Sequence, residues 1–222
     1  MRLFTIGMCA LMMTLVCAIA AAQPAPTPTP TPPPTATGRT FEIANTGGSR
    51  VQFVSDAPLE TITGVTSDVT GRITADPSNL RGAQGRIAVR IAAVRTGIDL
   101  RDEHLRSNNW LNAQQFPEAV FEITGVEGPN RLQPNRDTNL RIRGRFTVHG
   151  VTRDVVAQGR VQLVPATDAT RAAHVTGDAL IVRARFTIHL PDFNIAVPAA
   201  IRLKVSDEIE VNVSLRATAA AS

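Results

Sequence analysis

The chain is poor in reactive and aromatic side chains: it has two cysteines, one tryptophan, no tyrosine and a single lysine, Lys204, among 222 residues. Both cysteines, Cys9 and Cys17, lie in the first 22 residues. The rest of the chain therefore excludes disulfides, thiolate metal sites and a cysteine nucleophile, whatever the redox state of its compartment. The missing tyrosine excludes a phenol as a hydrogen-bond donor to a bound group.

Signatures of catalysis and of metal binding are also missing. The sequence contains neither a nucleophile elbow nor a glycine-rich phosphate loop. His149, His174 and His189 are scattered over different segments, without the paired spacing of metal ligands. We predict no catalytic residue and no metal site.

The N-terminal segment has the pattern of an export signal. Arg2 precedes a mostly apolar stretch over residues 3–19, and Ala20 and Ala22 form a small-residue cleavage site. We predict a signal peptide over residues 1–22 and a periplasmic or secreted protein. A signal retained as a membrane anchor is the alternative.

Residues 23–38 are almost entirely proline, threonine and alanine, a composition that favours extended polyproline II and forms no core. We predict a disordered linker here, one domain over residues 39–218 and a short tail over residues 219–222. About 180 residues are enough for one β domain with its own core.

The remaining pattern has a period of two, which is typical of antiparallel strands with one apolar and one solvated face. Leu140, Ile142, Phe146 and Val148 alternate with arginines, for example. We predict eight or nine strands in a closed barrel or a sandwich, and the clearest segments are residues 50–54, 65–74, 86–91, 119–126, 140–148, 154–164, 182–189 and 208–216.

Arginines on the predicted outer faces, such as Arg141, Arg143, Arg183 and Arg185, have three interpretations. Solvated side chains are the simplest, because antiparallel strands need polar residues on the wet face. Attraction to anionic lipid head groups at a membrane surface is the second. Nucleic-acid binding is disfavoured, since few aromatic residues share these faces and the chain carries an export signal.

Residues 99–109 break the period of two and predict one short, polar helix across one end of the barrel. Asp99 can cap its N-terminus, with Asp102 as an acidic residue in the first turn. Asp102 and Arg106 are spaced for a pair at i,i+4, and the helix can end at Ser107 to Asn109.

Three blocks of the sequence resemble the YceI-like family. The first comprises Thr96-Gly97, Arg101-Asp102, His104 to Ser107 and Trp110-Leu111, followed by Phe116-Pro117 and Phe121; the second runs from Leu140 to Gly144 and from Gly150 to Arg153; the third comprises Asp192 to Ile195 and Val205 to Ile209. The resemblance covers roughly residues 40–217. Leu190 and Asn194 depart from it, because the family often has Arg and Gly there; Asn can still adopt a left-handed turn.

The resemblance implies an all-β fold: a single, extended, eight-stranded antiparallel lipocalin-like barrel that holds an isoprenoid lipid or quinone as its ligand, with no other cofactor. The predicted lipid-binding residues are the aromatic and apolar side chains Phe53, Trp110, Leu111, Phe116, Phe121, Phe146, Phe186 and Phe193. From the pattern alone, the same side chains could equally fill a solid core.

Arg101, Asp102 and His104 have three possible roles. A structural network that fixes the helix to the barrel is favoured over contact with a lipid head group, and acid–base catalysis is the weakest. For the whole protein we predict a lipid carrier or store and no enzyme. An envelope stress or interaction module with a filled barrel is the alternative, followed by a lipid-modifying enzyme; a homodimer and a membrane surface stay open as partners.

Overall fold

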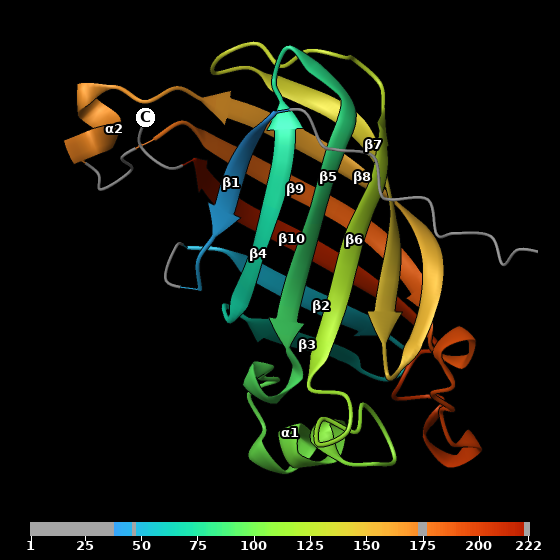
Figure 1. Ribbon diagram of the computed structural model, residues 1–222. Helices are drawn as coiled ribbons and strands as arrows, with labels where there is room; N and C mark the ends of the chain where they lie inside the picture. The colour runs from blue at the N-terminus through green and yellow to red at the C-terminus, as the bar shows by residue number, and fades with distance from the viewer. Residues whose placement is uncertain (1–37, 46–47, 173–176, 220–222) are drawn as a thin grey trace, which may run out of the picture. The chain divides into compact units, whose positions relative to one another are not determined.

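Ten strands form the wall of the domain, and the short helices lie at its ends (Figure 1). The computed structural model describes residues 38–45, 48–172 and 177–219. The elements, in chain order, are β1 (Arg39–Ile43), β2 (Arg50–Asp56), β3 (Thr61–Thr66), β4 (Val69–Asp76), β5 (Asn79–Arg90), η1 (Ile91–Ala93), α1 (Asp99–Arg106), β6 (Glu118–Glu127), β7 (Asp137–Val148), β8 (Val151–Val164), α2 (Asp168–Ala172), β9 (Ala179–His189), η2 (Leu190–Phe193), η3 (Ala199–Ile201) and β10 (Glu208–Ala219).

The strands close into an eight-stranded antiparallel barrel, as the resemblance predicts. The order around the wall is β1-β4-β5-β6-β7-β8-β9-β10, and the ring closes where β1 pairs with β10. β2 pairs with a different part of β10, from Ile209 to Ser214, and β3 pairs with β2. β1 and β2 are thus two parts of one interrupted strand, and β3 and β4 are two parts of the next.

The interruption between β3 and β4 corrects the sequence prediction, which treats residues 65–74 as one strand. β3 ends at Thr66 and β4 begins at Val69. The hydroxyl of Thr66 accepts a hydrogen bond of 3.1 Å from the backbone N–H of Asp68, a local turn that competes with strand pairing. At the other break, the buried hydroxyl of Ser49 accepts the backbone N–H of Arg216 at 3.1 Å.

The predicted signal peptide, nearly all of the linker, and residues 220–222 of the tail lie outside the described residues and stay predictions. The helix predicted over residues 99–109 is present as α1, which ends at Arg106. The five-residue α2 and the three 3-10 turns were not predicted. Across the described ranges, no helix combines the length and the apolar character that crossing a bilayer requires.

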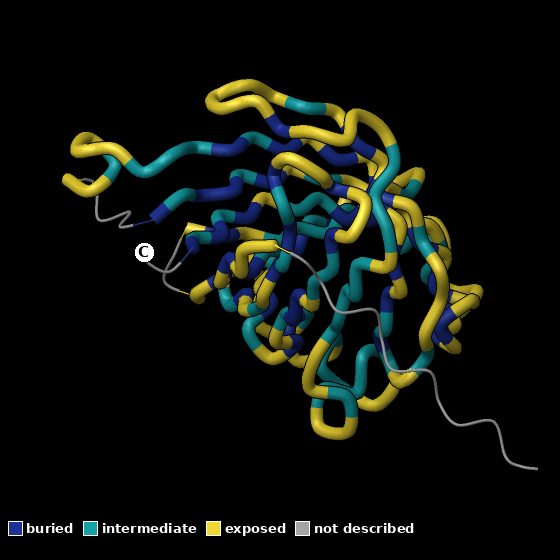
Figure 2. Tube along the Cα trace, turned by 45° about the horizontal axis from the view of Figure 1, so that its top comes forward, coloured by how far each residue is buried: buried dark blue, intermediate teal, exposed yellow. Residues whose placement is uncertain are grey.

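Along the strands, buried residues alternate with intermediate or exposed ones (Figure 2). In β7, Leu140, Ile142 and Phe146 are buried, whereas Arg141 and Arg143 are exposed. β9 and β10 repeat this pattern. Burial of the inner face gives one continuous apolar core, and this burial is the main source of stability for such a domain.

Several outward arginines pair with a carboxylate on the neighbouring strand, but Arg183 and Arg185 on β9 do not. Arg143 pairs with Glu127, and Arg145 pairs with Glu122 at 2.7 Å. Arg183 and Arg185 form no ion pair with any described residue. Arg183 also stands directly opposite Arg160 of β8 in the register, an arrangement of like charges that destabilises a sheet.

Replacement of Arg183 by glutamate is therefore expected to stabilise the barrel. The new carboxylate would face Arg160 across β8 and β9, and such a cross-strand pair contributes about 0.2–1 kcal/mol. Urea unfolding should show a higher midpoint, and the gain should shrink at high salt because the pair is exposed. Arg185→Glu is the matched control, since Arg185 lies between Gln158 and Asn212; an equal gain in both variants would contradict the explanation.

Candidate functional site

An apolar cavity of about 330 Å³ lies inside the barrel at the end that carries α1. Its walls come from β2, β3, β5, β6, β7, β9 and β10, and its mouth from α1, the segments on either side of α1 and the chain between β9 and β10. The residues that line it are mostly aliphatic or aromatic: Val51, Phe53, Ser55, Ile62, Gly64, Thr66, Val89, Ile91, Val94, Thr96, Arg101, His104, Leu105, Trp110, Leu111, Ala119, Phe146, Val148, Ile188, Leu190, Ile195, Ile201, Val205, Ile209 and Val211.

A second, smaller cavity of about 70 Å³ lies deeper in the barrel. Only strand residues line it, among them Phe121, Phe146 and Phe186. The rings of Phe121 and Phe186 are 5.6 Å apart between centroids, and those of Phe146 and Phe186 are 5.3 Å apart. Phe146 borders both cavities, so its ring forms part of the partition between them.

Two glycines on the inner wall make room for the rings of Phe53 and Phe121. Gly64 pairs with Phe53 across β2 and β3, and a Cβ added to Gly64 would lie 2.0 Å from the Phe53 ring. A Cβ on Gly144 of β7 would lie 2.4 Å from the ring of Phe121. Each ring therefore covers the backbone of a neighbouring strand, a packing that compensates for the missing side chain, and leaves the centre of the barrel open.

The structure brings most of the predicted lipid-binding residues together, but not all of them. Phe53, Trp110, Leu111 and Phe146 line the larger cavity, and Phe121, Phe146 and Phe186 line the smaller one. The other two lie outside both. Phe116 packs edge-on against His149 at 5.2 Å, and Phe193 is 2% exposed with its ring 5.7 Å from that of Phe146.

The chain between β9 and β10 contributes cavity residues that sequence reasoning missed: Leu190, Ile195, Ile201 and Val205. No periodicity marks this segment, because it consists of turns and 3-10 helix. The one available signal was Leu190, an apolar residue where the family often has Arg. Asn194 adopts the left-handed conformation, with a φ of 58°, so the turn survives the departure from Gly.

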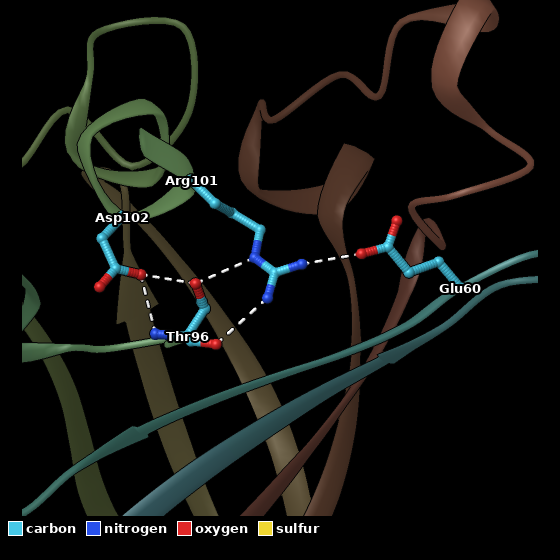
Figure 3. Close-up of polar contacts among 4 residues, drawn as sticks. All are labelled: Glu60, Thr96, Arg101 and Asp102. Atoms are coloured by element: carbon cyan, nitrogen blue, oxygen red, sulfur yellow. Dashed lines mark hydrogen bonds and ion pairs between the residues drawn. The ribbon is translucent and has the colours of Figure 1, made fainter. Parts of the chain in front are cut away.

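A buried carboxylate organises the chain before α1 (Figure 3). Asp102 is 2% exposed and accepts hydrogen bonds from the N–H and the hydroxyl of Thr96, at 2.8 and 2.6 Å. Arg101 donates to the hydroxyl and the carbonyl of Thr96, at 2.9 and 3.1 Å. Its guanidinium also pairs with Glu60 at 2.8 Å. The network ties α1 to the β2–β3 connection at the mouth of the cavity.

This arrangement corrects the predicted helix cap. The N-cap residue is Ile98, without a side-chain cap, and Asp99 is the first residue of α1. The carboxylate of Asp102 binds Thr96 rather than the helix start, and the described ion pairs include none between Asp102 and Arg106. His104 stands outside the network; its exposed side chain lies at the cavity mouth and bonds no other described residue.

Opposing effects act on the pKa of Asp102. Burial raises it, but the side-chain and backbone hydrogen bonds from Thr96, together with the charges of Arg106 and Arg95, outweigh burial and hold the pKa below its usual value. Asp102 is therefore a carboxylate near neutral pH. A doubly hydrogen-bonded carboxylate that is ionised near neutral pH suits a structural anchor better than an acid–base catalyst.

Asp102→Ala is expected to cost about 3 kcal/mol of unfolding free energy, since hydrogen bonds to a charged acceptor contribute roughly 1.5–3 kcal/mol each. Because the folded-state pKa lies below the unfolded value of about 3.9, the stabilisation is complete above that pH and is lost as the pH falls through the folded-state pKa. Urea unfolding between about pH 2 and pH 7 should show this loss in the wild type and not in the variant. Glu103→Ala, an exposed neighbour on α1, should behave like the wild type.

The outer wall and the metal-ligating side chains offer weaker candidate sites. A wider depression of about 860 Å³ lies on the outer wall over β7 to β10, among Arg141, Arg160, Arg183 and Arg185. It lies among arginines outside the barrel, so the apolar cavity inside the barrel is the better candidate site. Among the described residues, no group of three or more His, Cys, Asp or Glu is placed to hold a metal ion.

Comparison with known protein families gives a match over most of the domain: residues 43–217 match the YceI-like domain. A UPF0312 protein of Pseudomonas fluorescens is 34% identical over 97 residues, which are 44% of this chain and about half, 48%, of that protein. Protein YceI of Salmonella arizonae is 29% identical over 152 residues, covering 68% of this chain and 71% of that protein.

Solved structures share the fold at lower sequence identity. BcnA of Burkholderia cenocepacia has a TM-score of 0.63 at 16% identity, over 79% of this chain and 99% of its own. The YCEI protein of Campylobacter jejuni has a TM-score of 0.59 at 22% identity, over 72% and 85%. A polyisoprenoid-binding domain of Saccharophagus degradans, implicated in plant cell wall breakdown, has a TM-score of 0.61 at 17% identity, over 82% and 99%.

Proposed function

The chain belongs to the YceI-like family, and from this premise we propose that it is a lipid-binding protein of the periplasm or the secreted fraction that holds an isoprenoid chain inside its barrel. The observation that carries the proposal is the apolar cavity of about 330 Å³ inside the barrel. The polyisoprenoid-binding domain of Saccharophagus degradans, which shares the fold, supports the ligand class. The proposed location rests on the predicted signal peptide.

The chemistry of the cavity favours an apolar chain over a polar head group. Each buried methylene contributes about 0.8 kcal/mol, so an isoprenoid tail could bind without any polar contact, although lost motional freedom offsets part of the sum. The few polar groups, among them Thr96, Arg101 and His104, lie at the mouth. A tail would therefore enter first, with its head group left beside α1.

The size of the cavity sets an expectation for the length of the tail. Ligand pockets commonly measure about 300–1,000 Å³, so this cavity is at the small end. Among the described residues, the deeper cavity of about 70 Å³ is the space into which a longer tail could extend. We expect short isoprenoid tails to fit entirely and longer ones to protrude from the mouth or to displace the partition at Phe146.

The filled-barrel alternative predicts a cavity no deeper than one or two waters. A water takes about 30 Å³ in the liquid, far less than the 330 Å³ of the larger cavity. The cavity therefore favours the binding protein over the interaction module with a solid core. The lipid-modifying enzyme is the weaker alternative, because His104 has no hydrogen-bonded partner among the described side chains to activate it.

The test is the lipid content of the purified protein. Native mass spectrometry and organic extraction should detect a co-purifying isoprenoid, and the emptied protein should take up one quinone per chain from detergent. Uptake should require the tail, so a head group without a tail should not bind. Absence of any co-purifying lipid, together with no uptake of tailed quinones, would contradict the proposal.

A further inference from the structure

Large apolar side chains are exposed mainly at one end of the barrel. Leu59, Ile98, Leu100 and Leu203 are exposed by 68%, 53%, 61% and 59%, and together we name them the apolar rim. Among the described residues, the one other exposed large apolar side chain is Val156, which is less exposed, at 40%, and lies on the outer wall of β8. A grouped exposure of this kind marks an interaction surface more often than chance does.

A hydrogen bond and an ion pair join the segments that carry the apolar rim. The N–H of Leu59 donates to the carbonyl of Leu203 at 2.8 Å, which links the β2–β3 connection to the chain after η3. The ion pair of Arg101 with Glu60 links the same connection to α1, which carries Leu100 and follows Ile98. All three segments lie at the lower end of the barrel in Figure 1.

The apolar rim surrounds the mouth of the larger cavity. Arg101 and Leu105 of α1, and Ile201 and Val205 beside Leu203, line the cavity. Apolar surface thus continues from the exposed rim into the barrel. Exposing an isoprenoid tail to water is unfavourable. A continuous apolar path spares the tail this exposure only if the rim touches the place where the tail resides.

The charges around the apolar rim fit a membrane interface better than an all-apolar partner. Exposed Arg95, Arg202 and Lys204 flank the apolar side chains, and Asp99 and Glu103 are the exposed acids on α1. Arg202 also pairs with Asp207 at 3.4 Å. Apolar side chains with basic neighbours are typical of segments that settle about 5–10 Å into the boundary between head groups and acyl chains.

We propose that the apolar rim inserts into the surface of a phospholipid bilayer and lets an isoprenoid pass from the bilayer straight into the cavity. This inference rests on the proposed function, since it supplies the route for the same ligand. The source of the ligand is then the membrane itself, and the mouth of the cavity faces the bilayer during transfer. The apolar rim makes the contact, and the arginine-rich outer wall is not required.

The test supplies one quinone in two ways. Both are applied to the full-length wild-type protein and to the double variant Leu59→Ser/Leu203→Ser. In the first, vesicles of phosphatidylethanolamine and phosphatidylglycerol contain the quinone, and flotation and the extraction rate are measured. In the second, detergent delivers the quinone. We expect the double variant to float at least tenfold less and to extract at least tenfold more slowly, with affinity from detergent unchanged within twofold. Val156→Ser is the matched control and should behave like the wild type.

Each outcome decides between the two proposals. Wild-type extraction rates in the double variant, or a wild-type protein that binds no vesicle, would overturn the membrane contact while leaving the proposed function standing. Failure of the wild type to take up quinone from detergent would instead remove the proposed function. Both replaced side chains are exposed, so the variants should keep the wild-type unfolding midpoint, and this is measured first.

Discussion

Gly64→Ala is expected to reduce isoprenoid binding at least tenfold, equivalent to about 1.4 kcal/mol. The new Cβ would lie 2.0 Å from the ring of Phe53, so the ring must move away from the wall. Phe53 already lines the larger cavity, and the free space available to the ring is that cavity. Overpacking should also lower the unfolding free energy by about 1–3 kcal/mol. Titration with a tailed quinone from detergent measures the loss.

Two variants separate this mechanism from a general disturbance of the sheet. Gly82→Ala in β5 places its Cβ where nothing lies within 4 Å, so binding should be unchanged. In a Phe53→Ala background, Gly64→Ala should have little further effect, because the two residues then no longer compete for one space. A well-folded Gly64→Ala protein that binds quinone like the wild type would contradict the role given to the ring.

Phe146→Ala should have the largest effect on stability and should also change the ligand. Its ring is 8% exposed and packs against Phe186 and Phe193. Truncation of such a side chain costs about 3–5 kcal/mol. Because Phe146 borders both cavities, its loss should merge them. We expect the variant to prefer longer isoprenoid tails, and to recover stability when such a ligand is added.

Phe41→Ala distinguishes the change of cavity from simple destabilisation. Phe41 in β1 is 0% exposed and borders neither cavity, so its truncation should cost a similar free energy and leave the preferred tail length unchanged. Competition between quinones of different tail lengths, read by native mass spectrometry, gives the comparison. The same preference in Phe146→Ala and in the wild type would show that the partition does not limit the tail.

The sequence predicts the wall of the barrel well because inside and outside differ in solvent. Alternation in β7, β9 and β10 places apolar side chains and arginines on opposite faces. A hydrophobic core requires one apolar face on each strand, whichever residues of neighbouring strands pair. The break after Thr66 was not predictable from alternation, because a side-chain hydrogen bond to Asp68 makes it and the apolar pattern continues across it.

The hollow interior could not be read from the pattern. A filled barrel and a hollow one have the same alternation, and the difference depends on which ring faces which glycine. Gly64 lies opposite Phe53 only because the register of β2 and β3 puts it there. The mouth was missed for another reason: Ile201 and Val205 lie in turns without a period, where apolar residues give no direction.

The position of Trp110 makes the intrinsic fluorescence of this protein a probe of ligand binding. Trp110 is the single tryptophan of a chain without tyrosine, and its side chain lines the cavity. Near-ultraviolet emission therefore comes essentially from one indole, placed beside the proposed ligand. A quinone ring held at the mouth should quench that emission, whereas a polyprenol without the ring should only shift it to the blue as water leaves. One titration, without any label, would report occupancy and the class of ligand together.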